Sequence, residues 1–498
     1  MSEAFSLGRS QLSPEILVLL AQKANPKVNV EPDRWALLRD QRQVLESSIS
    51  QGKTIYGVNT GFGFLSQVRI PENQIEELQL NLIRSHACGV GEWMEAPLVR
   101  GLLLLKAHNF LQGNSGVTER CVQALLDFLR CDILPMIPSK GSVGASGDLA
   151  PLAHLALALI GEGRVLCQGD EMPTLDAMQK RGLRPLVPKM KEGLSLINGT
   201  HFMSVVGSAG FVEAKKLTYT ADVALALSLS AMKGTERAFD PRIHALRAHS
   251  GQVESAEHIR SLLSGTENPA YSKVQDPYSL RCGPQVHGVA RMTLDFVDSI
   301  LRTELNAITD NPLVFGEDVL SGGNFHGEPL ACSYDYLSIA LTELGNISER
   351  RTEKLTNPSM SGLPAFLTKS GGLNSGYMIP HVVAASLASE NKVLSHPSSV
   401  DSIPTSADKE DHVSMGAFGA RKLRMITKNL AWILAIELLA ACQAIDIAGD
   451  IVLSQALKRV YDQIRSLSPC MEGDRSLHRD IEEVSLLILK GGLLDGLS

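Results

Sequence analysis

Long runs of helical periodicity constrain the fold of this chain more than any other sequence feature. Apolar side chains recur at the helical spacing of about 3.6 residues from 286 to 308, and similar patterns run from 336 to 355 and from 415 to 445. Each run is longer than the average helix of a globular protein. We therefore expect long helices that lie side by side in a central bundle.

The remaining signals predict a mainly α fold with few strands. The best candidate for extended structure is KTIYGVNTGFGF, residues 53–64. We expect a smaller N-terminal region of loops and short strands, residues 1–115, followed by a helical-bundle region, residues 116–498. Glycine-rich segments punctuate the helices, as glycine does where the backbone turns sharply.

Composition limits the partners of the chain. Of its 498 residues 44% are hydrophobic, which suffices for a large core, and the net charge of −7 offers no basic footprint for nucleic acid or an anionic membrane. The apolar segment 429–449 carries Glu437, Gln443 and Asp446, which are costly in lipid, so it reads as a buried helix of a soluble protein.

The cysteines and the N-terminus indicate a cytoplasmic protein. The eight cysteines are scattered singly with no CxxC pair, which favours a reducing compartment. The first residues show no basic stretch followed by an apolar core, so no signal peptide is expected. No HExxH or other ligand spacing points to a metal site, and the sequence leaves open whether a bound metal supports activity.

The loop GSVGASGDLAP, residues 141–151, precedes a segment with a helical pattern and admits four interpretations. It could be a simple cap and turn, with Asp148 as N-cap and Pro151 in the first turn. A phosphate cradle would need GxGxxG or GK[ST], and neither is present. A hydrolase nucleophile elbow would need GxSxG, but Asp148 stands at the second glycine position.

The fourth interpretation is a reaction of the backbone itself. The small side chains of Ala145 and Gly147 would let the Gly147 nitrogen reach the carbonyl carbon of Ala145. Loss of water would close a five-membered ring, and loss of the Ser146 hydroxyl would leave an electrophilic methylene group. Larger neighbours would hinder the closure.

The loop resembles the signature of the histidine and aromatic amino-acid ammonia-lyases. Further segments resemble blocks of that family in the same order, so that the resemblance covers nearly the whole chain: YGVNTGFG (56–63), RSHACGVG (84–91), NGTHF (198–202), QDPYSLRCGPQ (275–285), TDNP (309–312), GGNFHGEP (322–329) and EDHVSMG (410–416).

This resemblance implies a cofactor, an activity and catalytic residues. The family builds 4-methylidene-imidazol-5-one (MIO) from a triplet that matches Ala145, Ser146 and Gly147, and uses it to eliminate ammonia from an α-amino acid without an external cofactor. By the same resemblance Tyr56 is the base that removes the β-proton, and Tyr278 is a second site tyrosine. Because a phenol is ordinarily protonated, nearby N–H donors or positive charge would have to stabilise a Tyr56 phenolate.

Substrate-binding residues follow from the same blocks. Arg281 can hold the substrate carboxylate with its two-pronged guanidinium, and Asn198 and Gln275 resemble the family's polar partners of the carboxylate and the cofactor. The substrate side chain would meet the pair Ser85-His86, which resembles that of the histidine-specific members, together with Phe325 and Glu410. These residues imply conversion of L-histidine to trans-urocanate and ammonia, the first step of histidine degradation.

Two departures and several alternatives stand beside this interpretation. Gly283 replaces a glutamine common in histidine-specific members, and His287 stands where an apolar residue is common, which bears on substrate positioning. A tyrosine- or phenylalanine-specific lyase or aminomutase is the alternative within the family, and an inactive helical scaffold is the alternative outside it. The resemblance also implies a homotetramer whose active sites combine loops of several subunits.

Overall fold

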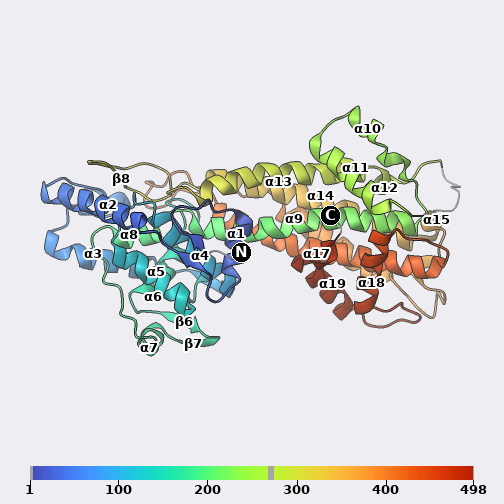
Figure 1. Cartoon of the computed structure of the whole chain (residues 1–498), viewed down its shortest axis with the longest axis horizontal. Helices are drawn as coiled ribbons and strands as arrows, with labels where there is room; N and C mark the ends of the chain where they lie inside the picture. Colours follow the sequence, from blue (N-terminus) through green and yellow to red (C-terminus); the bar gives the residue numbers. More distant parts are fainter. Residues whose placement is uncertain (1–3, 267–273, 497–498) are drawn as a thin grey trace. The chain divides into compact units, whose positions relative to one another are not determined.

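A computed structural model describes residues 4–266 and 274–496 of the chain, which form two compact units (Figure 1). Unit 1 comprises residues 1–209, 298–334 and 397–421, and unit 2 comprises residues 210–297, 335–396 and 422–498. The boundary expected at residue 115 falls inside unit 1, because helices α4 (Ala96–Phe110) and α5 (Glu119–Cys131) on either side of it pack together.

Helices and loops make up most of unit 1. Apolar faces of its helices meet in a core, and α4 alone buries twelve of its fifteen residues. The other helices that lie wholly in this unit are α1 (Pro14–Ala21), α2 (Pro32–Ser50), α3 (Ile75–His86), α6 (Leu149–Leu159), α7 (Thr174–Lys180) and α8 (Glu192–Ile197), with 3-10 turns at Gly63–Leu65 and Glu72–Gln74.

The strands of unit 1 are short and form small separate sheets. Among the strand pairs in the described residues, β1–β2 is parallel and the others are antiparallel. The sheets are β1 (Phe5–Ser6) with β2 (Val28–Asn29), β3 (Val90–Trp93) with β5 (Pro138–Lys140), β4 (Ile133–Pro135) with β6 (Arg164–Cys167) and β7 (Asp170–Pro173), and β8 (Leu313–Phe315) with β9 (Asp318–Leu320).

The expectation of an extended segment at residues 53–64 is wrong. This segment consists of turns and the start of a 3-10 helix, with an isolated bridge between Thr60 and Arg69. The reason is local: Gly57 and Gly63 have φ values of +66° and +53°, which bend the chain out of the extended conformation.

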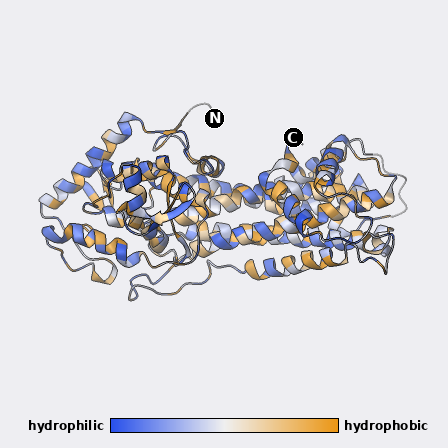
Figure 2. Cartoon of the chain, turned by 90° about the horizontal axis from the view of Figure 1, so that it is seen from below, coloured by the Kyte–Doolittle hydropathy of each residue, from blue (hydrophilic) through white to orange (hydrophobic). Residues whose placement is uncertain are grey.

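The predicted long helices are confirmed. They are α13 (Gly283–Leu305), α14 (Glu328–Thr356) and α17 (Gly416–Ala448), and α9 (His201–Ala231) joins them. In unit 2 they pack against one another, since Glu437 of α17 accepts hydrogen bonds from Ser228 of α9 and Ser348 of α14. Figure 2 shows hydrophobic and hydrophilic residues alternating along the helices, as expected where one face is buried.

Shorter helices complete unit 2. They are α10 (Pro241–Ala245), α11 (Ser250–Leu263), α12 (Tyr278–Arg281), α15 (Pro358–Ser361), α16 (Met378–Leu394), α18 (Gln455–Leu467) and α19 (His478–Lys490), with 3-10 turns at Glu236–Phe239, Ala365–Leu367 and Gly492–Leu494.

Helix α17 is apolar enough and long enough to cross a membrane, but it is a core helix here. Within its most apolar window 83% of the residues are buried inside the protein. Its Glu437 is fully buried and forms an ion pair with Arg351 of α14 (Nε–Oε1 2.5 Å). Burial against other helices therefore accounts for its apolar sequence, as expected for residues 429–449.

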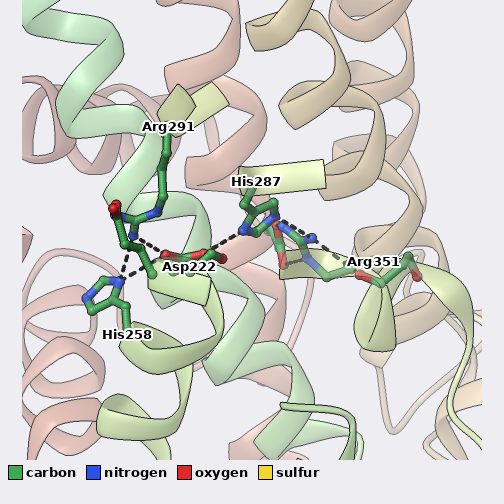
Figure 3. Close-up of polar contacts among 9 residues, drawn as sticks. Asp222, His258, His287, Arg291 and Arg351 are labelled. Carbon is green, nitrogen blue, oxygen red and sulfur yellow. Dashed lines mark hydrogen bonds and ion pairs between the residues drawn. The ribbon is translucent and has the colours of Figure 1, made fainter. Parts of the chain in front are cut away.

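Unit 2 also buries a network of charged and polar side chains, drawn in Figure 3. Asp222 of α9 lies between two histidines and an arginine: His258 Nδ1 at 2.9 Å, His287 Nδ1 at 2.7 Å and Arg291 Nη2 at 2.5 Å. On the far side of His287, its Nε2 lies 3.4 Å from Arg351 Nη1. The network thus joins α9, α11, α13 and α14.

Candidate active site

A cavity of about 1320 Å³ lies within unit 1. Most of the residues singled out from the sequence contribute to its wall. The predicted site residues that line it are Tyr56, Ser85, His86, Ala145, Ser146, Asn198, Phe325 and Glu410, together with apolar side chains of Leu78, Leu82, Leu149, Leu194 and Ile197. The cavity therefore offers polar groups on a largely apolar surface, as small-molecule sites do.

The loop at residues 141–148 enters this cavity directly before helix α6. As predicted, Asp148 occupies the N-cap position and the helix ends shortly before Gly161. The Asp148 carboxylate does not cap its own helix; it accepts hydrogen bonds from the Ser142 hydroxyl (3.1 Å) and the Met203 N–H (3.0 Å). The first turn of α6 thus keeps free N–H groups near Ser146, which favour negative charge there.

The backbone of residues 145–147 is pressed against the turn at 198–199. Gly147 has φ +76°, and a Cβ atom at this position would collide with the Gly199 backbone. Asn198 Nδ2 donates to the Ser146 carbonyl oxygen at 2.9 Å, and the Asp148 N–H donates to the Gly199 oxygen at 2.9 Å. Only glycine fits at position 147, so the close approach itself explains the small residue.

These residues fit a ring made from the triplet. Ala145 is 4% exposed, so little water reaches the carbonyl that a cyclisation would use. Ser146 Oγ donates to Glu410 Oε1 at 2.8 Å, which places a carboxylate beside the hydroxyl that would leave. Asn198 Oδ1 is buried without a hydrogen-bond partner and is available to a further donor.

Two buried ionisable groups lie behind the loop. Burial raises the pKa of Asp148 to about 7, even though the Met203 N–H and the Ser142 hydroxyl stabilise its carboxylate. Burial likewise lowers the pKa of Lys106 to about 7, and its ammonium group donates to the Asn198 carbonyl oxygen at 2.7 Å. Both groups can change charge near neutral pH.

Tyr56 lies in the glycine-containing turn at residues 55–63. Its hydroxyl oxygen accepts a hydrogen bond from the Gly63 N–H at 3.2 Å, and its ring meets Phe62 edge to face. The turn is held by Asn59, whose side chain accepts from the Ile55 N–H at 2.8 Å and donates to the Lys53 carbonyl at 2.9 Å. A backbone N–H donor is one of the groups that would stabilise a phenolate.

Ser85 and His86 end helix α3 at the cavity wall. His86 Nδ1 lies 2.9 Å from the Leu82 carbonyl oxygen and 3.0 Å from Ser85 Oγ, and donation to the carbonyl leaves Nε2 as the acceptor. Burial lowers the pKa of His86, and the Leu82 carbonyl and the Glu410 charge only partly oppose this effect. The structure thus keeps a neutral imidazole at this position.

Glu410 lies in the loop that precedes α17. Its Oε2 accepts hydrogen bonds from Thr405 Oγ1 at 2.7 Å and Ser406 Oγ at 2.9 Å, while Oε1 takes the bond from Ser146. Phe325, from the segment before α14, lines the same cavity. A carboxylate, an imidazole and an aromatic ring therefore share one wall with Ser146.

Three predicted residues lie elsewhere. Gln275, Tyr278 and Arg281 belong to unit 2 and do not line the unit 1 cavity. Tyr278 is 70% exposed, with the Arg281 guanidinium stacked 4.5 Å from its ring centre, and Arg281 Nε donates to the Asp276 carbonyl. Tyr278 thus lies on the surface of unit 2, and the half-buried Arg281 lies against it.

The two departures from the family pattern have structural explanations. His287 is fully buried, and its Nδ1 donates a hydrogen bond to Asp222, which an apolar residue could not do. Gly283 begins α13, and a side chain there would displace the end of Leu225. Both departures thus lie in the packing of unit 2.

Sequence reasoning missed two histidines of the cavity wall. His326 and His412 both line it, and their rings stack with centres 5.5 Å apart. They follow Phe325 and Glu410 by one and two residues, within blocks that the sequence already singled out. That proximity was the available signal, but nothing in the sequence brings residues 326 and 412 together.

The chain is similar to a known family of lyases. Residues 12–466 match the family described as aromatic amino acid lyase. A histidine ammonia-lyase of Alkaliphilus oremlandii is 47% identical over 94% of each chain. Two crystal structures are similar: histidine ammonia-lyase from Trypanosoma cruzi (TM-score 0.93, 43% identity, 99% of this chain and 95% of that one) and tyrosine aminomutase from Streptomyces globisporus (TM-score 0.94, 36%, 99% and 98%).

Proposed function

The chain belongs to the aromatic amino acid lyase family, and from this premise we infer that it converts L-histidine to trans-urocanate and ammonia by non-oxidative elimination. It is a carbon–nitrogen lyase that acts at the start of histidine breakdown. The observation that carries the choice of reaction is the hydrogen bond of Ser146 to Glu410 in a cavity that also holds His86.

We propose that Ala145, Ser146 and Gly147 form MIO. The Gly147 nitrogen bonds to the Ala145 carbonyl carbon, whose oxygen leaves as water; the Ser146 hydroxyl and its α-hydrogen leave as a second water. The close packing of Gly147 on Gly199 and the burial of Ala145 support this proposal. The ring supplies an electrophilic methylidene carbon that bonds to the substrate and makes its amine easier to expel. Asn198 would hold the ring through the carbonyl oxygen of Ser146.

Tyr56 is our candidate for the base that takes the β-proton of the substrate. It lines the same cavity as Ser146, and the Gly63 N–H bonded to its hydroxyl oxygen would stabilise the phenolate. The proton would move from the substrate β-carbon to the Tyr56 oxygen while the carbon–nitrogen bond breaks. Loss of the β-proton and of ammonia leaves the carbon–carbon double bond of urocanate.

Four side chains support an imidazole-bearing substrate. His86 Nε2 would accept the N–H of the substrate ring, Glu410 would accept a second donor, Ser85 would hold His86, and Phe325 would pack on the ring. Imidazole bonded in this way is favoured over a phenyl ring, because the phenyl ring would leave buried polar groups without partners. The same residues argue against tyrosine as the preferred substrate, although a tyrosine aminomutase is a structural neighbour.

We propose that the substrate carboxylate is held by a neighbouring subunit of a homotetramer. Gln275, Tyr278 and Arg281 lie outside the unit 1 cavity, and the pair of exposed Tyr278 and half-buried Arg281 suits a site on another copy of the chain. The guanidinium of Arg281 would bind the carboxylate with two hydrogen bonds. All eight cysteines are unpaired, which supports our proposal of a cytoplasmic location.

Two measurements test the function. Intact mass of purified protein should be lower than the sequence mass by two water molecules. Ultraviolet absorbance should show urocanate formed from L-histidine faster than the corresponding products form from tyrosine or phenylalanine. An unmodified mass would favour the inactive scaffold, and faster turnover of tyrosine would move the assignment to another substrate within the family.

A further inference from the structure

Two histidines of the cavity wall and a glutamate close to them have no part in the proposed reaction. They are His326, Glu328 and His412, and one ligand-capable atom of each lies within 4.8 Å of the other two. Glu328 is the first residue of α14, His326 stands two residues before it, and His412 follows Glu410 in the loop before α17. Two separate segments of unit 1 thus meet at this cluster.

His326 makes a hydrogen-bond contact to the backbone of the second segment. Its Nε2 lies 3.3 Å from the carbonyl oxygen of His412, and a carbonyl oxygen only accepts. Donation from Nε2 to this oxygen leaves the lone pair of Nδ1 available to an ion. Metal-binding histidines are held in this way in many proteins, with one ring nitrogen donating to a carbonyl and the other binding the ion.

Glu328 has one occupied and one unoccupied oxygen. Its Oε1 accepts a hydrogen bond from Cys332 Sγ at 3.2 Å, one turn further along α14. Its Oε2 is buried and has no hydrogen-bond partner. A buried carboxylate oxygen without a partner is costly, and a cation beside the two imidazoles would supply the missing interaction.

We propose that His326, Glu328 and His412 bind a divalent transition-metal ion of the zinc type. Two imidazole nitrogens and one carboxylate oxygen form a ligand set that suits zinc, and three protein ligands leave room for a water molecule. Half-buried His326 and Glu328 and exposed His412 leave the site open to ions from solution. Calcium or magnesium would prefer an all-oxygen set.

The position of the site gives the ion a structural role at the cavity. His326 adjoins Phe325, and His412 lies two residues from Glu410, so the ion would tie together the two segments that carry these cavity residues. Neither segment has a regular element at this point, since both precede the first turn of a helix. A bound ion would therefore restrict the wall that we assign to the substrate imidazole.

Titration of the full-length protein with zinc or cobalt tests the proposal. The protein is first treated with a chelator and the titration omits histidine, because histidine itself binds these metals. We expect one ion per chain, and visible cobalt absorption typical of a four- or five-coordinate site with imidazole ligands. His326→Gln, Glu328→Gln and His412→Gln should each weaken binding by more than the roughly 10–100-fold that loss of an outer-shell partner costs.

Matched controls separate this site from surface binding. His249→Gln and Glu483→Gln change exposed residues of unit 2 and should leave the affinity unchanged. Cys332→Ser should retain binding, because the thiol is not one of the three ligands. Unchanged affinity in the three site variants, or loss of binding in Cys332→Ser alone, would overturn the proposal. Since binding is read without substrate, its outcome is independent of the proposed lyase activity.

Discussion

Asp148 of unit 1 and Asp222 of unit 2 are both fully buried, yet the two regions treat their charge in opposite ways. Asp148 receives hydrogen bonds from a backbone N–H and a hydroxyl, and burial raises its pKa to about 7. Burial would raise the pKa of Asp222 too, but hydrogen bonds from His258 and His287 and the charge of Arg291 hold it well below its usual range. The hydrogen bonds to Asp148 do not offset the loss of water, whereas the two histidines and Arg291 around Asp222 do.

The difference extends to the surrounding groups. In unit 1, Asn198 Oδ1, Glu328 Oε2 and both ring nitrogens of His201 are buried without partners, and Asn198 lines the cavity. In the Asp222 network both carboxylate oxygens are used, although Arg291 Nε has no partner. The cavity thus keeps polar groups available for chemistry, while the network uses them to join helices. Substitutions should therefore affect activity in one region and stability in the other.

Ser146→Ala should give the largest effect and act on activity alone. Without the hydroxyl no methylidene group forms, so we expect kcat to fall at least about a thousandfold and the mass loss of two waters to disappear. Urocanate absorbance and intact mass measure the two changes. Ser139→Ala, in nearby β5, is the control and should keep both. If Ser146→Ala remained active, the cavity would not be the site of the chemistry, and the contrast with the Asp222 network would fail.

Asp222→Asn should act on stability. The change leaves Arg291 buried without its countercharge, and we expect unfolding free energy to fall by about 3–5 kcal/mol in urea titrations. Because the folded pKa is lowered, the carboxylate stabilises the native state above about pH 4 and this stabilisation is lost as the pH falls further. The variant should lack that acid-side slope. Asp295→Asn, exposed on α13, should change neither quantity.

Asp148→Asn should lower the unfolding free energy by less, about 1 kcal/mol near pH 5, because an amide can replace a neutral carboxylic acid. The folded pKa of about 7 lies above the unfolded value of about 4, so the native state binds more protons in this range. Wild-type stability should therefore fall, relative to the variant, as the pH rises from about 4 to 7. Urea midpoints at several pH values measure this slope, and parallel curves would contradict the contrast with Asp222.

Ser406→Ala should give the smallest effect. It removes one of the two hydroxyl donors to Glu410 Oε2, and we expect kcat/KM for histidine to fall about two- to tenfold, the value of one hydrogen bond. Ser466→Ala, exposed on α18, is the matched control. If Asp222→Asn lowered kcat/KM by the same factor in fully folded protein, the two regions could not be divided into one for activity and one for stability.

The sequence predicted the long helices well because their apolar periodicity is local. The run at 286–308 corresponds to α13, and that at 415–445 to α17. The segment 53–64 was misjudged because β-branched and aromatic residues favoured a strand, while Gly57 and Gly63 decide the turn. The positive φ angles of these two glycines outweighed the strand preference of the neighbouring residues.

The site was predictable in part for the same reason. Tyr56, Ser146 and Glu410 stand in short characteristic blocks, and one cavity holds all three. Their hydrogen bonds could not be predicted, since Ser146 and Glu410 are 264 positions apart. The sequence also singled out His287 as unusual, but its bond to Asp222 depends on how α9 and α13 pack. Contacts between distant segments require the fold.

The anchoring of the loop at residues 141–148 has a consequence for biosynthesis. Its backbone is tied to Gly199, and further on to Ser414 and Met415, through bonds to Asp148, Gly144 and Val143. A ribosome that has just made helix α6 has not yet translated those anchors. On the proposal that this anchored loop cyclises, we expect the serine to leave the exit tunnel as an ordinary residue, and a chain truncated before position 414 to carry it unreacted.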